Sequence, residues 1–148
     1  MDMRGETVLM LVFPATAQGT RHALRDVRGA LTRAGLAPEM LSRVETVLAE
    51  VLNNVAEHAC DARPAVPVRL TAELRGSALR VRAHDRGRPM PGGVPPAGAL
   101  PKRDVPRDLL PEGGFGWFLI REQSDSLFYR RADGENTLEL QFRPRVPG

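Results

Sequence analysis

Stretches of alternating apolar and polar residues, joined in pairs by short turns, are the strongest constraint on the fold. A period of two predicts β-strands with one buried face. The predicted strands are Val66–Leu74, Leu79–Ala83, Ser126–Arg131 and Thr137–Phe142. Gly76-Ser77 separates the first pair and Asp133-Gly134 the second, as expected for hairpin turns. The chain is therefore predicted to form a mainly antiparallel, mixed sheet.

Three helices and an N-terminal strand complete the predicted order. Apolar residues in Thr16–Ala34 recur every three or four positions, which indicates an amphipathic helix. Pro38 suits the first turn of a second helix. The apolar stripe of that helix consists of Leu41, Val44, Leu48, Val51, Val55 and Ala59. A strand over Thr7–Phe13 and a helix over Phe115–Glu122 follow from their apolar runs. With the helices on one face, the fold class is a two-layer α/β sandwich.

The segment Asp85–Glu112 differs from the rest of the chain. It is rich in proline and glycine and has no apolar periodicity. A structureless stretch of this length is uncommon in a compact domain unless it forms a lid or is disordered. We therefore predict a lid at about residues 90–112, within one domain that covers residues 1–148.

Composition limits the class of protein and its location. The 148 residues can bury a core, and 42% hydrophobic with 26% charged residues is ordinary for a soluble globular protein. The net charge of +3 comes from dispersed arginines, which indicates solvated faces rather than a surface for direct nucleic-acid binding. A lone cysteine, Cys60, excludes an internal disulfide and fits a cytoplasmic location. The apolar run Val8–Phe13 is too short to span a membrane.

The second predicted helix also carries a polar face. Glu50 and Asn54 are four residues apart, so their side chains project from the same side of the helix. A carboxamide oxygen can bind Mg²⁺ together with water and phosphates. A neighbouring carboxylate can act as a general base on a hydroxyl or a water molecule. A solvated polar face would produce the same spacing, so the motif alone leaves both interpretations open.

A second motif, Asp85-Arg86-Gly87, stands at the end of an alternating stretch. A carboxylate at a strand end can accept a hydrogen bond from the exocyclic amine of adenine, and a wrong base would leave that acceptor unpaired. Asp and Gly also favour plain turns for conformational reasons. The motif alone is compatible with both.

A third motif, the glycine-rich run Glu112–Ile120, opens the last predicted helix. Glycines at this position expose backbone N–H groups at the positive end of the helix dipole, which suits a phosphate. The run is not a Walker A loop, because no Gly-Lys-Ser/Thr follows. It also lacks the third glycine of a Rossmann fingerprint. A flexible hinge is the alternative.

Taken together, the three motifs resemble the N, G1 and G2 boxes of the GHKL ATPases, the superfamily of gyrase, Hsp90, histidine kinases and MutL. The chain most resembles the anti-sigma factor serine/threonine kinases of bacteria, over about Val8 to Arg143. The resemblance implies the Bergerat ATP-binding fold. The matching residues are Glu50, Asn54, Glu57, His58 and Ala59 in the N box, Asp85, Gly87 and Pro89 in the G1 box, and Glu112–Ile120 in the G2 box.

The resemblance implies a role for each matching residue. Asn54 would hold Mg²⁺, and Glu50 would activate the hydroxyl of a protein substrate. Asp85 would bind the adenine amine of ATP, and Gly87 would allow the backbone to approach. The glycines that would cradle the phosphates are Gly113, Gly114 and Gly116.

One position differs from the sequence pattern of the anti-sigma factor kinases. Some of its members carry an arginine just before the glycine box that can reach the γ-phosphate. Pro111-Glu112 stands there in this chain. Arg107 or Arg103, farther back in the lid, is left as the candidate for that role.

The resemblance implies partners and leaves three functions open. In the first, a homodimer with bound ATP holds a sigma factor and phosphorylates a serine or threonine of a STAS-domain antagonist. In the second, the chain is an ATP-sensing binding module without phosphotransfer. In the third, it is the ATP hydrolase of a larger gyrase-like machine, which would need a transducer domain.

Overall fold

The sheet is built from two hairpins and an N-terminal strand. The computed structural model describes residues 5–59, 66–90, 93, 95 and 114–145. The strands are β1 (Glu6–Pro14), β2 (Pro67–Arg75), β3 (Ala78–Asp85), β4 (Ser126–Ala132) and β5 (Glu135–Phe142). Their order across the sheet is β1-β2-β3-β5-β4, and each of the four pairings is antiparallel. The prediction of a mainly antiparallel sheet is therefore confirmed, with no parallel pairing among the described strands.

The turns form where the sequence predicts them. Gly76 has a φ of +60° between the paired residues Arg75 and Ala78. Asp133 and Gly134 have φ values of +54° and +75° in the β4–β5 turn. These left-handed values match the twist of the flanking strands and favour glycine or aspartate. The turn residues therefore fix the register of both hairpins.

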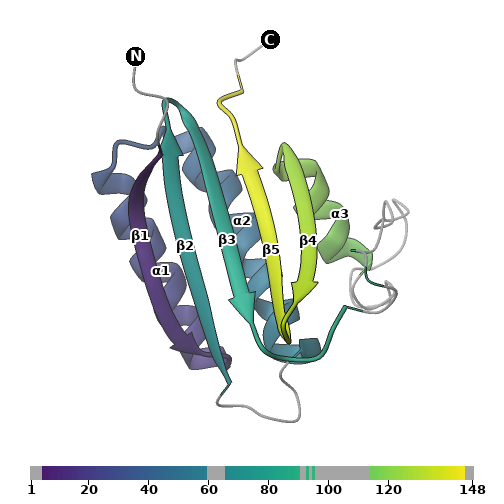
Figure 1. Ribbon diagram of the computed structural model, residues 1–148. Helices are drawn as coiled ribbons and strands as arrows, with labels where there is room; N and C mark the ends of the chain where they lie inside the picture. The colour runs from purple at the N-terminus through teal and green to yellow at the C-terminus, as the bar shows by residue number, and fades with distance from the viewer. Residues whose placement is uncertain (1–4, 60–65, 91–92, 94, 96–113, 146–148) are drawn as a thin grey trace, which may run out of the picture.

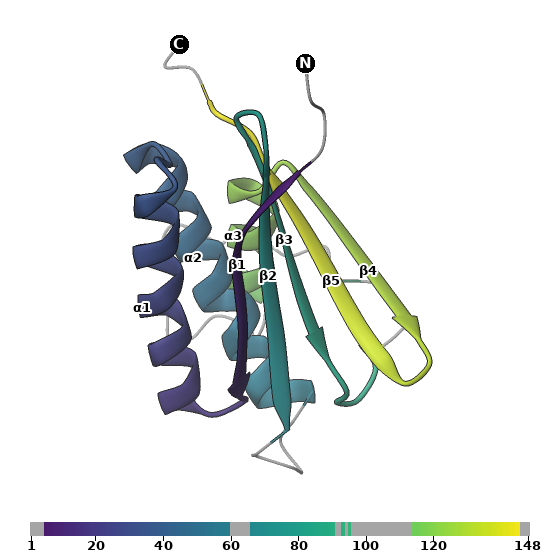
Figure 2. The ribbon, with the colours of Figure 1, turned by 60° about the vertical axis from the view of Figure 1, so that its left-hand side comes forward.

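Among the described residues, three helices cover one face of the sheet and none covers the other, which we call the open face (Figures 1 and 2). They are α1 (Ala17–Arg33), α2 (Pro38–Asn54) and α3 (Gly114–Gln123), and a π-helical turn, η1 (Val55–Ala59), follows α2. Thr16 caps α1 by accepting a hydrogen bond from the N–H of Gly19 at 2.9 Å, and Pro38 occupies the first turn of α2. The two-layer α/β sandwich is confirmed.

The buried face of α2 is wider than the predicted stripe. It includes Met40 and Val47, and also Arg43, whose exposed fraction is only 5%. The guanidinium of Arg43 is fully paired, because it donates to the Glu39 and Asp125 carboxylates and to two backbone carbonyls. α2 packs against both α1 and α3 and lies over the sheet (Figure 2), and a central helix buries more than one stripe.

Two of the elements that carry the predicted motifs, α2 and β3, end at the same end of the sandwich. The C-terminal ends of α2 and β3 and the β4–β5 turn lie at the lower end of Figure 1. Most of the predicted lid, residues 90–112, lies outside the described residues.

Candidate functional site

Helix α2 presents Glu50 and Asn54 one turn apart at its C-terminal end, and both residues are half-buried. The Nδ2 atom of Asn54 is buried and has no hydrogen-bond partner in the described part of the chain. A buried donor without an acceptor costs about 1–3 kcal/mol. A bound acceptor at this position would remove that cost.

The helix widens directly after Asn54. Val55–Ala59 form η1, in which the hydrogen bonds span five residues instead of four. Such turns occur often at functional sites, because the extra residue changes the direction of the side chains. Asn54 therefore lies at the junction between regular and widened helix.

Gly116 brings α3 against the carboxylate of Glu50. A Cβ atom added at Gly116 would lie 2.8 Å from Oε2 and 3.6 Å from Cδ of Glu50. Cβ atoms do not approach other atoms this closely, so any larger residue would displace the carboxylate. Gly114 is the first residue of α3, whereas Gly113 and Arg107 lie outside the described residues. The predicted base on α2 and one glycine of the predicted phosphate loop are thus in contact.

Asp85 is the last residue of β3, and its exposed fraction is 6%. Its Oδ1 atom accepts hydrogen bonds from the N–H of Gly87 at 2.8 Å and from Nδ2 of Asn136 at 2.9 Å. Within the described part of the chain, Oδ2 receives no hydrogen bond. A buried carboxylate therefore has one oxygen held by the protein and a second that can accept a bond from a ligand.

Asn136 was not predicted as a site residue, yet it is the centre of the hydrogen bonds around Asp85. It faces Asp85 across the β3–β5 pairing, and its exposed fraction is 5%. The signal in the sequence that could have identified Asn136 is its position in the alternating pattern of β5. Asn136 belongs to the inward-facing set of alternating residues, whose other members are apolar. These other members are Leu138, Leu140 and Phe142.

The face of the sheet opposite Asp85 carries a partly buried histidine, His84. His84, next to Asp85 in sequence, faces outward and lies 3.0 Å from Oγ1 of Thr137. Burial lowers the pKa of His84, the nearby Arg69 lowers it further, and Glu135 opposes both. His84 is therefore neutral near pH 7, and it lies on the other face of β3 from Asp85.

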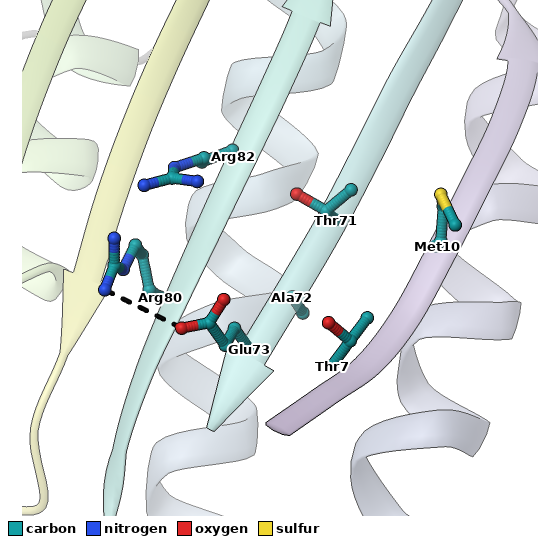
Figure 3. A pocket seen from close by; sticks show the side chains of 7 residues that line it. All are labelled: Thr7, Met10, Thr71, Ala72, Glu73, Arg80 and Arg82. Carbon is teal, nitrogen blue, oxygen red and sulfur yellow. Dashed lines mark ion pairs between the residues drawn. The ribbon is translucent and has the colours of Figure 1, made fainter. Parts of the chain in front are cut away.

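A shallow hollow also lies on this open face (Figure 3). Arg80 and Glu73 form an ion pair in it at 3.7 Å, and Met10 stands at its edge on β1. Its outward-facing side chains lie on the side of the sheet away from the helices, whereas Asp85 is buried on the inward face of β3. The lining residues are Thr7, Met10, Thr71, Ala72, Glu73, Arg80 and Arg82.

Two kinds of site are not found in the described residues. No group of three or more His, Cys, Asp or Glu side chains lies close enough together to hold a metal ion there. No helix in that part of the chain is long and apolar enough to cross a membrane. A cation at this site would need oxygen ligands from Asn54 and from a bound ligand.

Residues 13–142 match the family model of the histidine kinase-like ATPase domain. The chain belongs to this family. The matched residues include α2, Asp85 and α3.

The fold has a solved counterpart with low sequence identity. The structure of the RsbU and RsbW domains of Rv1364c from Mycobacterium tuberculosis is similar, with a TM-score of 0.61 and 18% identity. The match covers 91% of this chain and 32% of that one, so the chain spans about a third of the length of the longer protein. No curated protein matches the sequence significantly.

Proposed function

We propose that this histidine kinase-like domain binds Mg·ATP and transfers the γ-phosphate to a serine or threonine of a STAS-domain anti-sigma factor antagonist. The contact between Gly116 and the carboxylate of Glu50 carries the proposal. It joins a candidate base to the first turn of a helix whose N-terminus suits phosphate.

The two ends of ATP would bind to different elements. The adenine amine would donate to the unpaired Oδ2 of Asp85, because this oxygen is the acceptor that the protein leaves available. A phosphate oxygen would satisfy the buried Nδ2 of Asn54. The remaining oxygen of that amide is a hard ligand of the kind that Mg²⁺ accepts. Mg²⁺ would neutralise the charge on the phosphates.

Glu50 would act on the incoming hydroxyl. Its carboxylate takes the proton from the serine or threonine as the new oxygen–phosphorus bond forms. The bond between the γ-phosphorus and the bridging oxygen breaks, and ADP leaves. Gly116 leaves room for the carboxylate, so a larger residue would shift the base. Glycines 113 and 114 and Arg107 or Arg103 complete the proposed phosphate site.

The partners are proposed from the resemblance to anti-sigma factor kinases. A homodimer would hold a sigma factor when ATP is bound, and phosphorylation of the antagonist would control release. The likeness to a protein with an RsbW domain agrees with this assignment. A cytoplasmic location follows from the same partners.

The experiment is a phosphotransfer assay with Mg·ATP and a candidate STAS-domain partner, read by intact mass and phosphosite mapping. Phosphoserine or phosphothreonine on the partner, lost in Glu50→Gln, supports the proposal. Tight ATP binding without transfer to any cognate partner would favour the alternative, an ATP-sensing binding module. The absence of an arginine before the glycine box, where Pro111-Glu112 stands, is the feature that favours this alternative.

A further inference from the structure

Asn136 uses its side chain to join Asp85 to the turn that follows it. Its Nδ2 donates to Oδ1 of Asp85 at 2.9 Å, to the carbonyl of Arg88 at 2.9 Å and to that of Gly87 at 3.3 Å. A primary amide has two N–H donors, so both are engaged. One side chain therefore fixes the carboxylate and the backbone of the 85–88 turn.

The oxygen of the same amide is also held. Oδ1 of Asn136 accepts from the hydroxyl of Tyr129 at 2.5 Å and from the guanidinium of Arg131 at 2.9 Å. Tyr129 in turn accepts from the N–H of Met90 at 3.0 Å, and Arg131 donates to the carbonyl of Gly87 at 2.9 Å. The β4–β5 hairpin therefore holds the 85–88 turn through Asp85 and Gly87, and it also holds Met90 just after the turn.

A buried asparagine with a purely structural role needs hydrogen-bond partners only to offset the cost of burying its amide. The bonds of Asn136 also affect Asp85, whose two oxygens are held differently. Here the partners are unequal, because Oδ1 of Asp85 receives two N–H donors and Oδ2 receives none in the described residues. A carboxylate held through one oxygen cannot rotate freely about its own axis. It presents the other oxygen, which only accepts hydrogen bonds, in a fixed direction.

We propose that Asn136 is a positioning residue that fixes Asp85 so that the site selects a base with an exocyclic amine over one with a carbonyl at the same place. This inference rests on the proposed function, since it assigns the selectivity of the same nucleotide site. Without the amide of Asn136, the Asp85 carboxylate can turn, and the direction of the free acceptor is lost. Selectivity then falls more than affinity does.

The test compares the dissociation constants of ATP and inosine triphosphate, in which a carbonyl replaces the amine. Calorimetry gives both constants, and circular dichroism gives the folded fraction of each variant. The unaltered protein is expected to prefer ATP by about 100-fold. Asn136→Ala is expected to lower this preference about tenfold. Gln141→Ala, on the outward face of the same strand, is the matched control and keeps the preference.

Tyr129→Phe extends the test if Asn136→Ala does not fold. It removes one hydroxyl that supports Asn136 and Met90 but does not contact Asp85. The expected fall in the preference for ATP is about threefold, since a bond to a supporting group is lost. An unchanged preference in Tyr129→Phe, with Asn136→Ala unfolded, contradicts the positioning role.

Two further outcomes separate this inference from the proposed function. If the unaltered protein prefers ATP and a folded Asn136→Ala loses ATP and inosine triphosphate affinity equally, Asn136 is only structural. The inference is then wrong and the proposed function stands. If the unaltered protein binds neither nucleotide, the proposed function is wrong and the inference fails with it.

Discussion

The two ends of the proposed nucleotide site are built differently. Around Asp85, the sheet supplies a dense set of hydrogen bonds through Asn136, Tyr129 and Arg131. Around Asn54, a buried donor has no partner in the described part of the chain. The first region is organised before any ligand binds, whereas the second leaves a donor that the described residues do not satisfy. In the proposed site, the strands thus supply a fixed half, and the helices supply a half that the phosphates of ATP would complete.

The largest expected effect is on phosphotransfer by a substitution of Glu50 in α2, which should leave ATP binding almost unchanged. Glu50→Gln keeps the shape of the side chain but removes the base, so phosphotransfer is expected to fall about 1000-fold. The affinity for ATP is expected to change less than about threefold, because the adenine contacts are untouched. Single-turnover phosphotransfer and calorimetry measure the two quantities.

The matched control for that variant is Glu122→Gln, an exposed carboxylate on α3. It is expected to behave like the unaltered protein in both assays. Equal losses of transfer in the two variants would show that Glu50 acts only through overall charge.

Asp85→Asn tests the fixed half of the site. An amide would turn an N–H toward the adenine amine, so one hydrogen bond is replaced by two opposed donors. ATP affinity is expected to fall about 100-fold. Asp26→Asn, an exposed aspartate on α1, removes the same charge and should leave affinity unchanged. An unchanged affinity for ATP in Asp85→Asn would show that Asp85 does not bind the adenine.

Substitutions of the two asparagines are expected to change the stability of the protein in different ways. Asn136→Ala is expected to lower the free energy of unfolding by about 2–3 kcal/mol, because it leaves buried partners unpaired. Asn54→Ala is expected to raise that free energy by about 1 kcal/mol, since it removes a buried donor that is already unpaired and alanine favours helix.

Urea denaturation without nucleotide measures both changes. Asn54→Ala should nevertheless abolish the dependence of ATP binding on Mg²⁺, because the proposed oxygen ligand is gone. Equal destabilisation by the two substitutions would contradict the division of the site into a fixed half and an unsatisfied half.

The smallest predicted effect concerns two glycines in helices. Gly116→Ala places a Cβ atom 2.8 Å from the Glu50 carboxylate, so phosphotransfer is expected to fall about tenfold. Gly29→Ala in α1 meets only the end of the flexible Arg33 side chain, at 3.2 Å. It should raise the free energy of unfolding by about 0.5 kcal/mol. Full transfer activity in Gly116→Ala would show that Glu50 need not stay where the structure places it.

Much of the fold follows from local signals in the sequence. The turn residues Gly76 and Asp133-Gly134 set the hairpins, and Thr16 and Pro38 start the helices as expected. These signals are local because turn conformation and capping depend on a few neighbouring residues.

Other features depend on contacts between distant segments. The pairing of Asn136 with Asp85 requires the β3–β5 register, and 51 residues separate the two positions. The burial of Arg43 requires partners that are distant in sequence, Asp125 just before β4 and Arg143 just after β5. A spacing rule can place Glu50 beside Asn54 on one helix, but it cannot show that Gly116 of another helix closes against Glu50.

A crystal structure with Mg²⁺ and a non-hydrolysable ATP analogue would show directly where the nucleotide binds. We expect the adenine amine within hydrogen-bond distance of Oδ2 of Asp85, and the phosphates between Asn54 and the start of α3. Asn136 should keep its bond to Oδ1 of Asp85. A nucleotide bound elsewhere, such as on the open face of the sheet, or an adenine that does not contact Asp85, would contradict the proposed nucleotide site.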